Sequence, residues 1–199
     1  SFTIPRLTPF ALTATGSDAN GDSVTYLWEE HDLGTSSTSA TVGTDDGSRP
    51  LFRSYSPSTT PTRMFPSLTY IRNNANTPPL NYTCVGGGTC TTGEVLPSTS
   101  RTMTFMVTAR DNRAGGGGIN TAQTQVVVNA ALGPFAVTAP NSAVSWTGTT
   151  SQTVTWSETG TSAIAATVRI LLSTDGGATF PTVLLNGTPN DGTETVTVP

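Results

Sequence analysis

The chain has 199 residues, a formal net charge of −4 and only 11% charged side chains. All nine basic residues are arginines, and they are scattered. This argues against a nucleic-acid-binding protein, which needs a concentrated basic face. No run of about 18 apolar residues occurs, so we expect no membrane insertion. The chain opens at Ser1 without a start methionine or a signal peptide, so we expect an excised or processed piece of a larger protein.

The polar residues are mostly Thr, Ser, Gly and Asn, a composition that favours strands and turns and predicts an exported all-β protein. Residues 1–17 read as short strands broken by two prolines. Residues 23–31 alternate cleanly, with Val24, Tyr26 and Trp28 on one face, so we expect Trp28 in the core.

Between residues 35 and 101 this alternation weakens. A long irregular stretch is uncommon inside a compact domain. We interpret it as a loop-rich insertion in a first domain, with short strands near Leu51–Tyr55 and Thr62–Phe65.

Two cysteines, Cys84 and Cys90, flank the segment VGGGT within this insertion. The spacing favours a disulfide that closes a small local loop; the alternative is two free thiols. No second Cys or His pair completes a zinc site. A disulfide would place the protein in an oxidising compartment.

Regular alternation returns after residue 101, where Met103, Phe105 and Val107 share one face. A boundary falls near residues 129–135, and five further short strands follow, separated by Gly, Asn, Asp or Pro. This predicts two tandem Ig-like or PKD-like β-sandwich domains, residues 1–131 and 132–199. The second is short for an Ig-like sandwich of about 100 residues. We expect it to continue beyond Pro199 in a parent protein or to lack its last strand here.

The segment GSDANGDSVTYLWEEHDLG, followed later by FMVTARDNRAGGGG and TQVVVN, resembles a PKD-type domain, although WEEHDLG stands where that family usually has Trp-Asp-Phe-Gly-Asp-Gly. Longer segments such as SRPLFRSYSPSTTPTRMFPSL and VRILLSTDGGATFPTVLLNG resemble the region that follows the catalytic domain of secreted bacterial reprolysin-like zinc metallopeptidases. The resemblance implies a non-catalytic accessory module of a secreted or cell-surface protein. Its partners would be other domains of the same polypeptide and a protein or polysaccharide substrate.

The sequence offers no convincing catalytic constellation. A zincin needs two histidines and a glutamate on one helix, and His31 is the only histidine. No Gly-x-Ser-x-Gly elbow is present, and we expect His31 at the surface. Glu29 and Glu30 are adjacent on a strand, so they point to opposite faces and do not form a glycosidase pair. A hydrolase therefore remains only a remote alternative.

A calcium site is the better supported hypothesis. Asp18, Asn20 and Asp22 offer oxygen atoms at alternate positions, and calcium takes six to eight oxygen ligands. Gly21 stands at the fourth position and strands flank the turn, so the segment is not an EF-hand. The resemblance adds Asp111, which would arrive from a different strand. The alternative is a plain Asx-turn without metal.

A third class is an adhesion or carbohydrate-binding module. It would need exposed aromatic side chains on one face, for which Tyr55, Tyr70 and Tyr82 are the candidates.

Residues 173–180 match the Asp-box pattern, which predicts a structural hairpin rather than a catalytic motif. In that hairpin we expect Asp175 to bond the turn and Phe180 to pack beneath it. A single copy cannot build a propeller.

Overall fold

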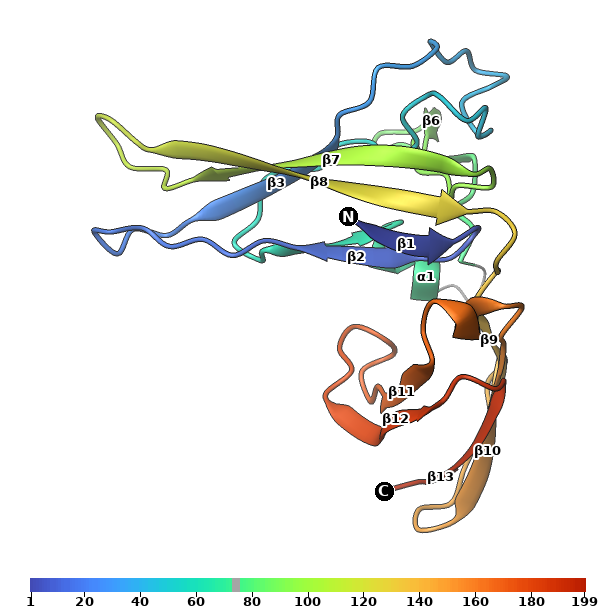
Figure 1. Cartoon of the computed structure of the whole chain (residues 1–199). Coiled ribbons are helices and arrows are strands. Elements are labelled where there is room, and N and C mark those ends of the chain that lie inside the picture. The colour runs from blue at the N-terminus through green and yellow to red at the C-terminus, as the bar shows by residue number, and fades with distance from the viewer. Residues whose placement is uncertain (73–75) are drawn as a thin grey trace.

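Figure 1 shows a computed structural model of the chain, which describes residues 1–72 and 76–199. Strands dominate these residues, so the all-β prediction is confirmed. Within the described ranges the only helical elements are α1 (Leu68–Arg72) and the 3-10 turn η1 (Thr161–Ala163). None of the helices described is long or apolar enough to cross a membrane.

A four-stranded sheet forms the centre of residues 1–131, called the N-terminal part below. Its strand order is β1-β8-β7-β3, with bounds of Phe2–Pro5 (β1), Ile119–Asn129 (β8), Arg101–Arg110 (β7) and Thr25–Glu30 (β3). β1 runs parallel to β8, with Phe2 opposite Val126, and the other neighbours are antiparallel. The first strand of this part therefore pairs with its last.

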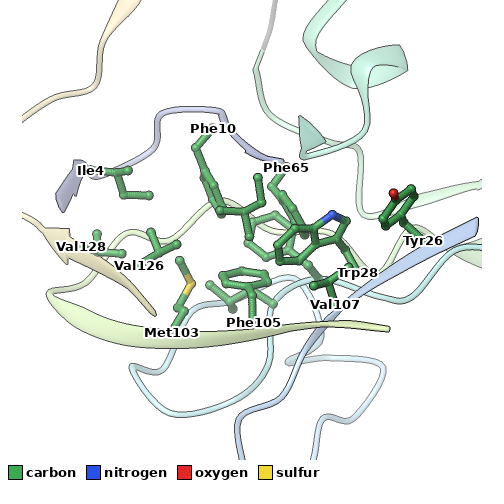
Figure 2. Packing of buried hydrophobic residues seen from close by; sticks show 13 residues of the cluster. Ile4, Phe10, Tyr26, Trp28, Phe65, Met103, Phe105, Val107, Val126 and Val128 are labelled. Atoms are coloured by element: carbon green, nitrogen blue, oxygen red, sulfur yellow. The ribbon is translucent and has the colours of Figure 1, made fainter. Parts of the chain in front are cut away.

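A two-stranded sheet packs against one face of the larger one. It pairs β2 (Phe10–Thr13) with β4 (Thr62–Phe65). Figure 2 shows the rings that meet between the two sheets: the centroid of Phe65 lies 4.8 Å from that of Phe105 and 5.0 Å from that of Phe10. The Trp28 indole lies in the same core and donates its Nε1–H to the Pro61 carbonyl at 3.0 Å. These contacts make the N-terminal part a sandwich with an aromatic centre.

The alternation read from the sequence explains which side chains enter this core. Met103 and Phe105 are fully buried and Val107 is nearly so. On β3 the inward set is Tyr26 and Trp28, as expected. Strands with a period of two can bury one face against a second sheet and leave the other exposed to water.

The insertion is only partly as expected. β4 forms at its predicted position, but the strand expected at Leu51–Tyr55 does not. Within residues 51–55, Phe52 forms an isolated β-bridge with Glu94. The backbone N–H groups of Leu51 and Phe52 donate instead to the Glu30 carboxylate, so they are not available to a neighbouring strand.

A small hairpin within the insertion was not predicted. It consists of β5 (Asn81–Thr83) and β6 (Thr89–Thr91). Cys84 and Cys90 form the expected disulfide across its tip. A disulfide is compatible with an extracellular protein.

Residues 132–199, called the C-terminal part below, form two further small sheets. One has the order β13-β10-β9, with bounds of Thr193–Thr197, Ser151–Ser157 and Ala136–Ala139, and the other pairs β11 (Thr167–Leu172) with β12 (Thr182–Pro189). Their buried hydrophobic residues are Val154, Trp156 and Val196. Among the described residues, two hydrophobic clusters lie on either side of residue 131. The division into two tandem domains stays a prediction, as does continuation beyond Pro199.

Candidate functional site

The strongest candidate site lies in the turn between β2 and β3. Asp18 Oδ1 accepts the backbone N–H groups of Asn20 at 2.8 Å and Asp22 at 2.9 Å. This is the geometry of an Asx-turn, in which a carboxylate replaces a backbone acceptor. Gly21 has a φ of 83°, which the tight turn requires and other residues rarely adopt.

The connection between β7 and β8 brings a third carboxylate to this turn. One oxygen each from Asp18, Asp22 and Asp111 lies within 4.8 Å of the others. The resemblance implied that Asp111 would arrive from a different strand, and Asp111 lies beside the turn in the structure. Asn20, the fourth predicted ligand, is exposed and contributes its backbone N–H to Asp18.

Backbone donors hold Asp111 in place. Its carboxylate accepts the N–H of Gly118 at 2.7 Å and that of Arg113 at 3.1 Å, and these bonds lower its pKa. The Arg113 guanidinium also lies 3.3 Å from Asp22, but this ion pair is exposed. Three carboxylates and one guanidinium leave a net negative charge. Such a group of hard oxygen atoms suits a divalent cation such as calcium.

The residues considered for catalysis do not meet in one site. His31 is exposed and its Nδ1 lies 3.3 Å from Gln123 Nε2. Glu29 accepts the Ser54 hydroxyl at 2.8 Å on one side of β3. Glu30 points into the core on the other side, with a fully buried side chain.

Glu30 belongs to a buried charge cluster that the sequence analysis missed. Its Oε2 accepts the N–H of Leu51 at 2.6 Å and that of Phe52 at 3.0 Å, while its Oε1 lies 3.7 Å from Arg101. Arg101 also pairs with Asp45 at 2.9 Å. Burial raises the pKa of Glu30 to about 7, although the two N–H donors and Arg101 act to lower it.

A second buried pair holds another part of the insertion. Glu94 is fully buried and lies 3.3 Å from Arg63. Its other oxygen accepts the Ser67 N–H at 2.9 Å and the Tyr55 hydroxyl at 3.1 Å. The Arg63 side chain donates in turn to the Trp28 carbonyl of β3 at 2.6 Å. The pair thus ties the insertion to the edge of the larger sheet.

A sequence signal for the first cluster was present. Glu30 follows Tyr26 and Trp28 at intervals of two residues, and Arg101 precedes Met103 in the same way. Both charges therefore had to face the core, and opposite charges on neighbouring strands can pair there.

Two of the three tyrosines considered for binding are exposed and meet around arginines. Tyr55 is 38% exposed and Tyr82 is 40% exposed. The Arg53 and Arg63 guanidinium groups lie 5.1 and 4.9 Å from the Tyr55 ring centroid, and Arg53 bonds Tyr82. Burial and the Glu94 carboxylate raise the pKa of Tyr55 to about 12, with a smaller contribution from Tyr70. Two guanidinium groups therefore make cation–π contacts with the Tyr55 ring.

The Asp box forms the hairpin turn expected of it. Asp175 accepts the Thr179 backbone N–H at 2.9 Å and its hydroxyl at 2.7 Å. These bonds hold the pKa of Asp175 well below its usual range. The expectation for Phe180 is wrong, because this residue is 48% exposed. It lines an apolar groove between the two small sheets of the C-terminal part.

Comparison with known proteins finds no relative of this chain. A scan against family models, a search of curated proteins and a search of solved structures each return no significant match.

Proposed function

We propose that the chain is a non-catalytic accessory module of a larger secreted or cell-surface bacterial protein. It serves as a spacer or as a scaffold that binds a substrate or partner, and the parent would be a metallopeptidase of the kind that the sequence resembles. One observation carries the proposal. The buried carboxylates of Glu30, Asp45 and Glu94 are bonded to arginines and backbone N–H groups that hold the insertion on the sheet. These charges serve the architecture of the chain.

The test uses the purified chain itself. We expect no hydrolysis of casein or of chromogenic glycosides. Co-sedimentation with insoluble protein and with insoluble polysaccharide then distinguishes a substrate-binding scaffold from a spacer, because only a scaffold is retained. Hydrolysis of either substrate class by the chain would contradict the proposal.

We also propose that the Asp18, Asp22 and Asp111 carboxylates bind calcium. The support is that two loops from different strands bring three carboxylate oxygens within 4.8 Å of one another, and that among the described residues their one ion-pair partner is the exposed Arg113. The remaining ligands would come from the Asn20 amide, backbone carbonyls and water. The alternative is the metal-free Asx-turn, whose hydrogen bonds are fully formed.

A melting curve with calcium and with chelator tests the metal site. A cation that binds only the folded chain stabilises it by about 2.7 kcal/mol at a hundredfold excess over Kd. We expect the melting temperature to rise with calcium and the rise to be lost in Asp111→Asn. Asp191→Asn is the matched control, because Asp191 is exposed and makes one backbone bond outside the cluster. An identical melting temperature in calcium and chelator would leave the Asx-turn as the correct interpretation.

A second candidate function is the binding of a neutral saccharide. A cavity of about 430 Å³ lies between β3 and residues 55–68, a size typical of small-ligand sites. Its walls combine aromatic and aliphatic side chains, hydroxyl groups and one charged side chain: Tyr26, Leu27, Trp28, Tyr55, Met64 and Leu68, with Ser56, Ser58, Thr60, Thr62 and Ser67, and Arg63. Apolar surface suits the C–H face of a sugar and hydroxyls suit its polar edge.

Calorimetric titration with neutral oligosaccharides tests this candidate. We expect binding heat with the wild-type chain and none with Leu68→Trp, which places a larger side chain in the wall of the cavity. Tyr82→Ala should retain the heat, because Tyr82 lies outside this cavity. No heat with the wild-type chain would exclude the candidate.

A further inference from the structure

The connection between the two parts of the chain, residues 132–135, makes hydrogen bonds to both parts. Arg6 donates its backbone N–H to the Leu132 carbonyl at 3.0 Å, and Phe135 donates its N–H to the Thr8 hydroxyl at 2.9 Å. On the other side, Gly133 donates its N–H to the Thr159 carbonyl at 3.0 Å. The connection therefore joins the turn between β1 and β2 to the C-terminal part by regular hydrogen bonds.

Gly133 also shows how closely this connection is packed. Its φ is 85°, which favours glycine. An added Cβ would lie 2.7 Å from Pro5 Cβ and 2.9 Å from the Arg6 carbonyl oxygen. Neither neighbour is the end of a flexible side chain, so the connection cannot move aside cheaply at this point.

A second contact lies at a different place. Arg72, at the end of α1, donates its Nε–H to the Gly176 carbonyl of the Asp-box turn at 2.7 Å. An added Cβ on Gly177 would lie 3.2 Å from Arg72 Cγ, so the arginine lies directly against the turn. Figure 1 shows α1 on the side of the N-terminal part that faces the C-terminal part.

The Asp-box turn is built to keep its shape under such a contact. Asp175 accepts the Ser173 hydroxyl at 2.7 Å and the Thr179 N–H at 2.9 Å, and Gly177 donates its N–H to Ser173 Oγ at 2.7 Å. These bonds fix the Gly176 carbonyl where the Arg72 guanidinium meets it. A turn held in this way is a better docking surface than a flexible loop, because little entropy is lost on contact.

We infer that the Asp-box turn is a docking element that fixes the angle between the two parts of the chain. The bonded connection restricts this angle at one point, and a second contact away from it removes the rotation that one attachment still permits. Relative motion is otherwise the expected behaviour of parts joined by a small interface. The inference concerns the geometry of the chain and does not rest on the proposed function.

Nuclear spin relaxation of backbone amides tests the inference, because it gives a rotational correlation time for each part separately. The variants are Arg72→Ala, Gly133→Ala and their combination. Arg110→Ala is the control for loss of an exposed arginine. Gly187→Ala is the control for strain at a positive φ, since Gly187 has a φ of 96° and open space around an added Cβ.

We expect the two parts of the wild-type chain and of both controls to share one correlation time. The double variant should show two shorter and different times, and Arg72→Ala alone, whose side chain is exposed, should show part of this separation in a folded chain. Separate correlation times in the wild-type chain would overturn the inference. A common time in the folded double variant would overturn it equally.

Discussion

Among the residues described, the N-terminal part holds thirteen buried hydrophobic side chains in one cluster, whereas the C-terminal part holds three. The buried polar groups differ as well. The N-terminal part buries Arg49, Arg101 and Glu94, which carry charges. The C-terminal part buries neutral groups around Asn190, whose amide accepts the Trp156 indole N–H at 2.8 Å and donates to Thr161 at 3.1 Å.

The difference in buried charge follows from the loops that each part contains. The N-terminal part carries a loop-rich insertion with few backbone hydrogen bonds to neighbouring strands, and hydrogen bonds from charged side chains fix the insertion in their place. The C-terminal part has no loop as long as the one between β3 and β4, and its buried polar groups gather around the Asn190 amide. Burying charges is costly unless each is paired, so the N-terminal part can carry them only with a large core around them.

The largest expected effect is the loss of an aromatic side chain from the larger core. Phe105 is fully buried against Phe65 and Phe10. We expect Phe105→Ala to lower the free energy of unfolding of the N-terminal part by about 3–5 kcal/mol. Amide spectra recorded through a urea titration give a midpoint for each part. The midpoint of the C-terminal part should stay unchanged, and an equal shift in both parts would show that they unfold as one unit.

The second effect tests the buried charges directly. Arg101→Met leaves the carboxylates of Glu30 and Asp45 buried without their cation, which should cost about 3–5 kcal/mol. Arg113→Met removes the exposed partner of Asp22, and exposed pairs contribute about 0–1 kcal/mol. The same urea titration measures both variants. Equal costs would contradict the view that burial sets the importance of these charges.

The third effect is a dependence of stability on pH. The pKa of Glu30 is raised from its usual value to about 7. A raised pKa favours the protonated folded chain, so this contribution is fully present below about pH 4.5 and is lost as the pH rises through about 7. The pKa values of 4.5 and about 7 limit the fall to about 3–4 kcal/mol.

Glu30→Gln isolates this contribution, because glutamine is neutral at every pH and similar in size. We expect the difference in unfolding free energy between the wild-type chain and this variant to move in favour of the variant between pH 5 and pH 8. Asp45 changes stability in the opposite direction: burial would raise its pKa, but the N–H groups of Thr99, Gly47 and Ser98 lower it. Its contribution is therefore lost as the pH falls through that lowered value. If the difference in unfolding free energy between the wild-type chain and Glu30→Gln stayed constant from pH 5 to pH 8, Glu30 would be charged over that whole range.

Local pattern was enough to predict the regular strands of both parts. The alternation around Trp28 and Phe105 predicted their burial, and the spacing of Cys84 and Cys90 predicted their bond. These features depend on residues that are close together in the sequence, so the sequence alone is enough to predict them.

The insertion was less predictable for a physical reason. The apolar pattern around Phe52 indicates a strand, but Glu30, far away in sequence, takes its backbone N–H. Likewise, nothing local shows that Asp45 would meet Arg101. Contacts of this kind depend on how the insertion folds back, and the turn residues that decide this carry little periodic signal.

The parallel pairing of β1 with β8 has a consequence for biosynthesis. Phe2 lies opposite Val126, so β1 is translated more than a hundred residues before the strand that it pairs with. Pairing between segments this distant is slow, and unpaired strands are prone to association during that interval. The nascent chain must therefore keep Phe2–Pro5 unpaired until β8 has emerged.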